Sequence, residues 1–136
     1  MLSPSTETLR LFLHVVFASV WVGGQLALAG LVPTLRRVAP DAVKQIAQAF
    51  ARLAWPAFGL TVITGMWDLM AEDVGNKSSA WQATLLLKIS VAILSGVFVM
   101  VHTIGKSKVA LAVGGALGLL TAVGAVYLGI LLNTRA

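Results

Sequence analysis

The chain has 136 residues, of which 58% are hydrophobic and 11% charged, with a net charge of +5 and a mean hydropathy of +0.91. A soluble domain averages about 45–50% apolar and about 25% charged residues, so this composition excludes an ordinary soluble domain and indicates a protein of the lipid bilayer. The absence of cysteine excludes disulfides, thiolate metal sites and cysteine nucleophiles. The basic residues lie in short loops between apolar runs, so we read them as topology signals and expect no nucleic-acid partner.

Four apolar segments, each long enough to cross about 30 Å of hydrocarbon, follow one another along the chain. They cover about residues 8–35, 45–71, 81–104 and 109–132. Ser3 and Pro4 predict the start of the first helix and Pro33 predicts its end. The N-terminal residues lack the pattern of a signal peptide. We therefore predict an all-α fold, a single transmembrane domain over residues 1–136 built as an integral membrane four-helix up-down bundle.

Lysine and arginine are distributed unevenly between the two ends of this predicted bundle. The richer end holds Arg36, Arg37, Lys44, Arg52, Lys106 and Lys108. The other end holds Arg10, Lys77 and Arg135. By the positive-inside rule, the richer end is cytoplasmic, so we expect a multi-pass protein of the inner (plasma) membrane with its N- and C-termini outside.

The first apolar segment carries His14, Trp21 and Gln25 along one face, because residues spaced by seven and four lie close together on a helix. Trp21 is too deep for an interfacial anchor, so we expect it to pack in the core. A polar stripe is costly at membrane depth and makes its ionisable member, His14, a candidate functional residue. The alternative is that His14 only forms hydrogen bonds that hold helices together.

The second and third segments also carry polar residues, namely Thr64 and Asp68 in one and Lys88 and His102 in the other. The up-down topology places His14, Asp68 and Lys88 in the outer half of the bundle. We predict an ion pair between Lys88 and Asp68, acting as a gate or as a purely structural contact. Lys88 snorkelling towards the interface is the alternative.

His102 lies about 21 Å further along the helix axis than Lys88, at 1.5 Å per residue. This separation argues against a haem held by both His14 and His102 within one monomer, since both ligands must approach one iron. Met66 and Met70 are candidate soft ligands, because thioether and imidazole suit Cu(I). They lie, however, on the helix face opposite Thr64 and Asp68.

The order and spacing of these motifs resemble the copper resistance protein D (CopD) family over nearly the whole chain. The matching pieces are His14-x6-Trp21-x-Gly23-Gly24, then Pro33 with Arg36 and Arg37, then residues 50–56, Thr64-Gly65, Leu87-Lys88 and His102. The resemblance implies a membrane protein that binds copper or helps to transfer it across the inner membrane. It implies His14 as the chief ligand and Met66 or Met70 as partners. The chain matches only the four-helix core of that family.

A second resemblance is to the HemJ-type protoporphyrinogen oxidases, which are four-helix membrane proteins with a histidine in the first span and a lysine in the third. Here Lys88 is followed by Ile89, and the short connection Gly105–Lys108 lacks the motif expected before the last span. This resemblance implies haem b as the alternative cofactor, with His14 or His102 as ligands. We expect a protein that is not an enzyme. A third possibility is an accessory subunit of a larger membrane complex, or a homo-oligomer.

Overall fold

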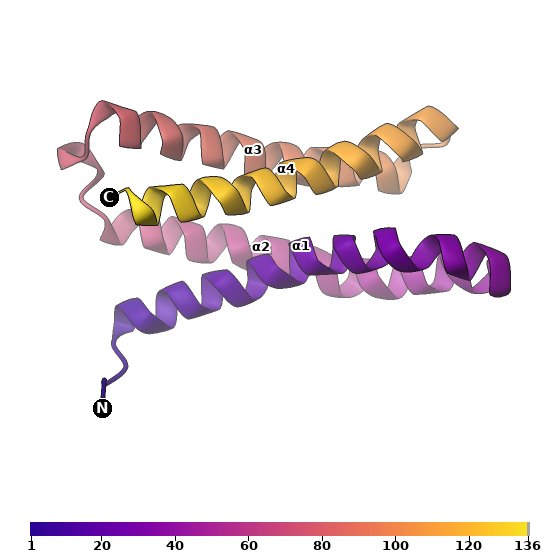
Figure 1. Ribbon diagram of the computed structural model, residues 1–136, viewed down its shortest axis with the longest axis horizontal. Helices are drawn as coiled ribbons and strands as arrows, with labels where there is room; N and C mark the ends of the chain where they lie inside the picture. The colour runs from indigo at the N-terminus through magenta and orange to yellow at the C-terminus, as the bar shows by residue number, and fades with distance from the viewer. Residues whose placement is uncertain (136) are drawn as a thin grey trace. The chain divides into compact units, whose positions relative to one another are not determined.

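The computed structural model describes residues 1–135, which form four α-helices and two short 3-10 turns (Figure 1). In chain order they are α1 (Thr6–Val38), η1 (Pro40–Ala42), α2 (Val43–Ala71), η2 (Val74–Asn76), α3 (Ser79–Ile104) and α4 (Lys108–Thr134). Each α-helix is long and apolar enough to span a membrane. The predicted all-α fold is confirmed, and the predicted spans agree with the helices to within about three residues.

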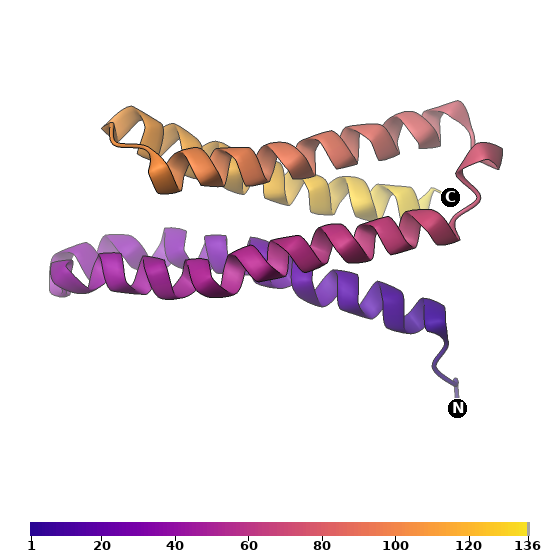
Figure 2. The same ribbon diagram turned by 180° about the vertical axis from the view of Figure 1, so that it is seen from behind.

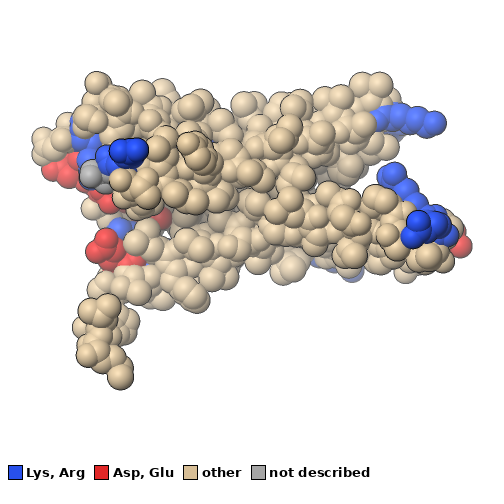
Figure 3. Space-filling view, in the orientation of Figure 1, with Lys and Arg blue, Asp and Glu red and all other residues tan. Residues whose placement is uncertain are grey.

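The chain divides into two compact units, Met1–Glu72 and Asp73–Ala136. The first unit is the antiparallel pair α1 and α2, and the second is the antiparallel pair α3 and α4 (Figures 1 and 2). Short connections of a few residues join the two helices of each pair, as expected for antiparallel neighbours. On the face that Figure 3 draws, most lysine and arginine side chains lie near the ends of helices, and other residues cover most of the lengths between them.

Helix α1 begins two residues later than the sequence predicted, because its N-cap is Ser5 and not Ser3. The Ser5 hydroxyl accepts a hydrogen bond from the backbone N–H of Thr8 at 3.1 Å, and the Thr8 hydroxyl accepts one from the backbone N–H of Ser5 at 3.3 Å. This reciprocal capping box satisfies two donors that would otherwise lack partners.

The far end of α1 also differs from the prediction, because Pro33 lies inside the helix instead of ending it. Membrane helices tolerate an internal proline, since local adjustments and neighbouring groups satisfy the freed carbonyl. The helix ends at Val38, just before Ala39 and Pro40. A residue before proline is disfavoured in the helical region, and Ala39 has φ −150° and ψ 64°. Pro40 is therefore the proline that terminates α1.

An aromatic cluster forms the core of the first unit. Trp21 of α1 is only 4% exposed. Its ring lies 4.5 Å from that of Phe58 and 5.2 Å from that of Trp55, centroid to centroid, with both partners on α2. The tilted and edge-to-face angles of 40° and 62° are those that aromatic pairs prefer. The expectation that Trp21 packs in the core is confirmed.

Close backbone approach holds the second unit together. Serine N-caps begin both helices, with Ser78 before α3 and Ser107 before α4. In the middle of the pair, the fully buried Ser95 donates a hydrogen bond to the carbonyl of Gly118 at 3.0 Å. Gly114 is buried where α4 crosses the last turns of α3. Small residues allow such approach between membrane helices.

Replacing Gly114 with alanine is expected to destabilise the second unit by about 1–3 kcal/mol, the usual range for overpacking. A Cβ at this position would lie 2.7 Å from the backbone nitrogen of His102 and 2.9 Å from the carbonyl oxygen of Phe98. Because single backbone atoms of a helix cannot shift without the rest of the helix, the added methyl group would force α3 and α4 apart. Thermal unfolding of the detergent-solubilised protein measures the loss.

The matched control is Gly124→Ala in the same helix. Its Cβ would lie 3.6 Å from a methyl group of Val91, an ordinary van der Waals contact. Since alanine is the better helix former by about 1 kcal/mol, this variant should be as stable as the parent or more so. Equal melting temperatures for the two variants would contradict the role given to Gly114.

Candidate functional site

The predicted ligand residue His14 lies half-buried in α1, facing α2. Its ring nitrogen Nδ1 is 3.0 Å from the hydroxyl oxygen of Thr64. Thr64 is only 5% exposed, and its hydroxyl also lies 2.7 Å from the carbonyl oxygen of Leu60, one turn earlier in α2. The structure thus brings together two of the residues that the sequence analysis selected.

These hydrogen bonds favour one tautomer of the His14 ring. The Thr64 hydroxyl has a single proton, and it donates that proton to backbone carbonyls of its own helix, which can only accept. With the proton on one of these carbonyls, the hydroxyl oxygen accepts from His14, and Nδ1 carries the ring proton. In the neutral ring, Nε2 is then the atom with the lone pair. A histidine fixed through Nδ1 in this way presents Nε2 in a defined direction, as metal-ligating histidines do.

Gly65 makes room for this ring. A Cβ built on Gly65 would lie 3.1 Å from Cε1 and 3.6 Å from Nδ1 of His14. A side chain here would press on the imidazole, so the glycine and the neighbouring Thr64 together position His14. The Thr64-Gly65 pair that contributed to the family resemblance therefore has a physical role in this fold.

A second polar contact joins the same two helices one turn away. The guanidinium Nε of Arg10 donates a hydrogen bond to Asp68 Oδ1 at 2.5 Å. The side chains are 10% and 20% exposed, so this ion pair is largely withdrawn from solvent. Arg10 precedes His14 by four residues and Asp68 follows Thr64 by four, which places both contacts on the same antiparallel seam.

Sequence reasoning missed the role of Arg10, because it counted that residue among the charges flanking the membrane. The structure corrects this: Arg10 lies inside α1 and is a buried member of the candidate site. One signal in the sequence could have indicated this contact. Arg10 precedes His14 by four residues and Thr64 precedes Asp68 by four, so two antiparallel helices that pair His14 with Thr64 also bring Arg10 close to Asp68.

Asp68 therefore has a partner within its own unit, in addition to any contact with Lys88. The predicted Lys88–Asp68 pair would join the two units and stays a prediction. Within the second unit, Lys88 is half-buried and lies against α4, where a Cβ built on Gly129 would be 3.3 Å from its Nζ. The end of the Lys88 side chain therefore packs against α4 near Gly129.

Gln25, Met66 and Met70 are the remaining candidates on α1 and α2. Gln25 donates through Nε2 to the carbonyl of Trp21 at 3.1 Å, so its amide bonds to its own helix. Met66 is 59% exposed and Met70 is 85% exposed. At 100° per residue they lie about 160° and 120° around α2 from Thr64. Within the first unit, the structure does not bring either methionine to His14.

His102 occupies the last turns of α3, where its exposed ring crosses the start of α4. Its Nδ1 lies 2.6 Å from the carbonyl oxygen of Leu111. A carbonyl can only accept, so Nδ1 is again the donor and Nε2 the acceptor atom. A Cβ built on Gly115 would lie 3.0 Å from Nδ1, so this glycine also makes room for a histidine. The two histidines belong to different units.

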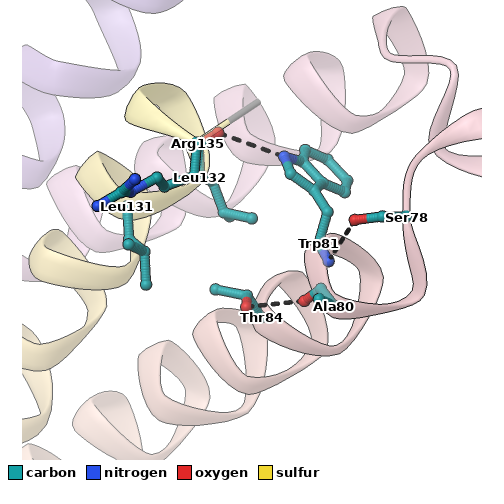
Figure 4. A pocket seen from close by; sticks show the side chains of 7 residues that line it. All are labelled: Ser78, Ala80, Trp81, Thr84, Leu131, Leu132 and Arg135. Carbon is teal, nitrogen blue, oxygen red and sulfur yellow. Dashed lines mark hydrogen bonds between the residues drawn. The ribbon is translucent and has the colours of Figure 1, made fainter.

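A separate pocket of about 230 Å³ lies between the start of α3 and the end of α4 (Figure 4). It is lined by Ser78, Ala80, Trp81, Thr84, Leu131, Leu132 and Arg135. Most of its polar groups bond to backbone: Trp81 Nε1 donates to the Leu132 carbonyl at 3.3 Å and Thr84 donates to the Ala80 carbonyl at 2.9 Å. The pocket therefore offers a ligand few polar groups that are not already hydrogen-bonded, and the contact between α1 and α2 at His14 is the stronger candidate site.

No group of three or more histidine, aspartate or glutamate side chains within residues 1–135 is placed to hold a metal ion. Any metal at His14 would thus take a single imidazole from the first unit. Comparison of the chain with models of known protein families, with curated proteins and with solved structures finds no match. The resemblance to the CopD and HemJ families consequently depends on the residue pattern alone.

Proposed function

We propose that this multi-pass membrane protein binds a metal centre through Nε2 of His14. The observation that carries the proposal is the hydrogen-bond chain from His14 Nδ1 to Thr64 and on to the Leu60 carbonyl, which orients the ring. If His14 served only to hold the two helices together, a single hydrogen bond between them would be enough. The space left by Gly65 against the ring favours a positioned imidazole.

Copper is the first candidate for the metal, on the strength of the CopD-like pattern. In this function the protein would receive copper at its outer side and help to pass it across the inner membrane. Imidazole suits copper, but a copper ion also needs further ligands. Since Met66 and Met70 lie away from His14 within the first unit, those ligands would have to come from outside this helix pair.

Haem b is the second candidate, and the composition of the site favours it. Haem iron can be held by a single protein imidazole, because the porphyrin supplies the other in-plane ligands. His14 is the one imidazole of the first unit, so it meets this requirement without additional residues. Bound haem would supply one-electron redox chemistry, while the protein would hold and orient it and shield it from water.

The expected location is the inner membrane with both termini outside, from the positive-inside distribution of Lys and Arg. This orientation places His14 and the Arg10–Asp68 pair in the outer half of α1 and α2. A role as a homo-oligomer or as an accessory subunit requires the protein to purify with partners, and co-purification from mild detergent tests that role. Labelling of single cysteines introduced at Ser3 and Lys106 tests the orientation.

Ligand titration of the purified protein in detergent distinguishes the two candidates. One series uses hemin, followed by the Soret absorption band, and the other uses Cu(I) in competition with a chromogenic chelator. We expect His14→Ala to abolish binding of whichever ligand the parent protein holds. Gly65→Ala, which displaces the ring, should weaken binding about 10-fold or more, as changes to residues that position a ligand do.

Gly59→Ala is the matched control, because a Cβ at this position of α2 meets no atom within 4 Å. It should bind the ligand as the parent does. Equal affinities for the parent and His14→Ala would show that His14 is not a ligand. A parent protein that binds neither hemin nor Cu(I) would overturn the proposed function.

A further inference from the structure

Three polar residues of α2 form a continuous stripe near the start of the helix. Lys44, Gln48 and Arg52 are spaced by four residues, so they follow one another along one face over about 12 Å. All three are exposed in the first unit, and we call them the basic stripe. The stripe lies at the opposite end of α2 from Thr64 and Asp68, and the proposed function does not involve it.

The packing of Phe50 shows that the basic stripe faces away from α1. The Phe50 ring lies against Gly24 of α1, where an added Cβ would overlap it. Gln48 and Arg52 are each two residues from Phe50, which places them about 160° around α2 from that contact. The basic stripe therefore lies on the side of α2 that α1 leaves uncovered, in agreement with the exposure of its side chains.

The positive charges of the basic stripe lack a counter-ion among the described residues 1–135. Neither Lys44 nor Arg52 forms an ion pair or a side-chain hydrogen bond within that part of the chain. Residues 36–52 carry four cations and a single acid, Asp41. The stripe therefore presents an excess of positive charge and of hydrogen-bond donors, which suits an external anion.

The position of Arg52 along α2 indicates which anion is available to it. Arg52 precedes Asp68 by sixteen residues, which is about 24 Å along the helix. With Asp68 near one border of a hydrocarbon layer about 30 Å thick, Arg52 lies about 6 Å inside the other border. The long arginine side chain can reach the interface from this depth. Phospholipid phosphates lie at that interface, and a guanidinium binds phosphate through two parallel hydrogen bonds.

We propose that the basic stripe binds the headgroup of an anionic phospholipid. Arg52 holds the phosphate from the border of the hydrocarbon, and Lys44 lies about 12 Å further along α2, within the headgroup region. Gln48 adds an amide donor between the two cations. A lipid of net negative charge fits best, because the ammonium group of a zwitterionic lipid would meet like charges. The inference is independent of the metal proposed for His14.

Native mass spectrometry of the intact protein, released from detergent micelles, tests this lipid site because it resolves the protein with no, one or more bound lipids. Phosphatidylglycerol and phosphatidylcholine with the same acyl chains are titrated separately. The readout is the ratio of their affinities for the first bound lipid. Each basic residue near an anionic surface strengthens binding about fivefold, so the parent is expected to favour phosphatidylglycerol by about 25-fold. In Arg52→Gln the ratio should fall about fivefold, and with Lys44→Gln added it should fall close to one.

Lys106→Gln is the matched control for net charge. It removes one positive charge from an exposed position in the other basic connection, between α3 and α4. It should keep the ratio of the parent, because the proposed contact depends on the position of the cation. Arg52→Lys keeps the charge without the planar fork, so its ratio should lie between those of the parent and Arg52→Gln. Circular dichroism identifies any variant that fails to fold.

Three results would overturn the inference. Equal affinities of the parent for the two lipids would show that the protein has no preference for an anionic headgroup. Equal losses in Lys106→Gln and Arg52→Gln would mean that net charge alone accounts for the preference. A parent-like ratio in the double variant of Lys44 and Arg52 would place the bound lipid elsewhere on the protein.

Discussion

Replacing Asp68 with leucine is expected to lower the free energy of unfolding by about 3–5 kcal/mol, the range for removing one member of a buried ion pair. The loss arises because the guanidinium of Arg10, with a side chain only 10% exposed, would keep its charge without a counter-ion. Arginine cannot shed its proton to escape this cost. Equilibrium unfolding of the purified protein in mixed micelles, followed by circular dichroism, measures the change.

A double-mutant cycle isolates the pair from other effects of the substitution. Arg10→Met together with Asp68→Leu removes both charges and keeps similar side-chain volume, so the double variant should lie within about 1 kcal/mol of the parent or be more stable. The coupling energy between the two positions is then several kcal/mol. If the double variant is as unstable as Asp68→Leu alone, the ion pair does not account for the loss.

The second large effect is expected for Trp21→Ala, at about 3–5 kcal/mol. Trp21 is 4% exposed and packs against the rings of Trp55 and Phe58. Truncation leaves a cavity between α1 and α2 and forfeits many dispersion contacts, which are a main source of helix association inside a bilayer. The same unfolding experiment measures this loss, and near-ultraviolet circular dichroism reports the altered environment of Trp55.

Trp67→Ala provides the matched control, because it removes the same side chain from a position that is 39% exposed. Trp67 belongs to α2 but not to the aromatic cluster, so its truncation should cost about 1 kcal/mol or less. Comparable losses for Trp21→Ala and Trp67→Ala would mean that the cluster is not the core of the first unit.

The membrane class and the four helices follow from local features of the sequence. Apolar segments of about 20 residues, broken by short polar loops, predict the spans directly, because each helix satisfies its own backbone groups within the bilayer. The errors occur at the ends. Ser5 and Pro40, rather than Ser3 and Pro33, bound α1, since the choice among neighbouring caps and prolines depends on small energy differences at each terminus.

The residues of the candidate site were only partly predictable. The pattern of period near 3.6 placed His14 on an inward face of α1 and Thr64 with Asp68 on a shared face of α2. It also placed Met66 and Met70 away from that face, where the structure leaves them exposed. Such periodicity says which residues share a face of one helix, and it says nothing of which residue on another helix they meet.

The sequence by itself determined that lipid is the main solvent of this protein and that its costly polar groups, His14 and Asp68 among them, need partners. Only the tertiary structure decided that Arg10 is the partner of Asp68 and that Nδ1 of His14 forms a hydrogen bond with Thr64. Both contacts depend on the rotation and axial register of α1 against α2. That register is fixed by the packing of side chains along the whole seam, from Arg10 to Trp21, and no single segment of the sequence contains it.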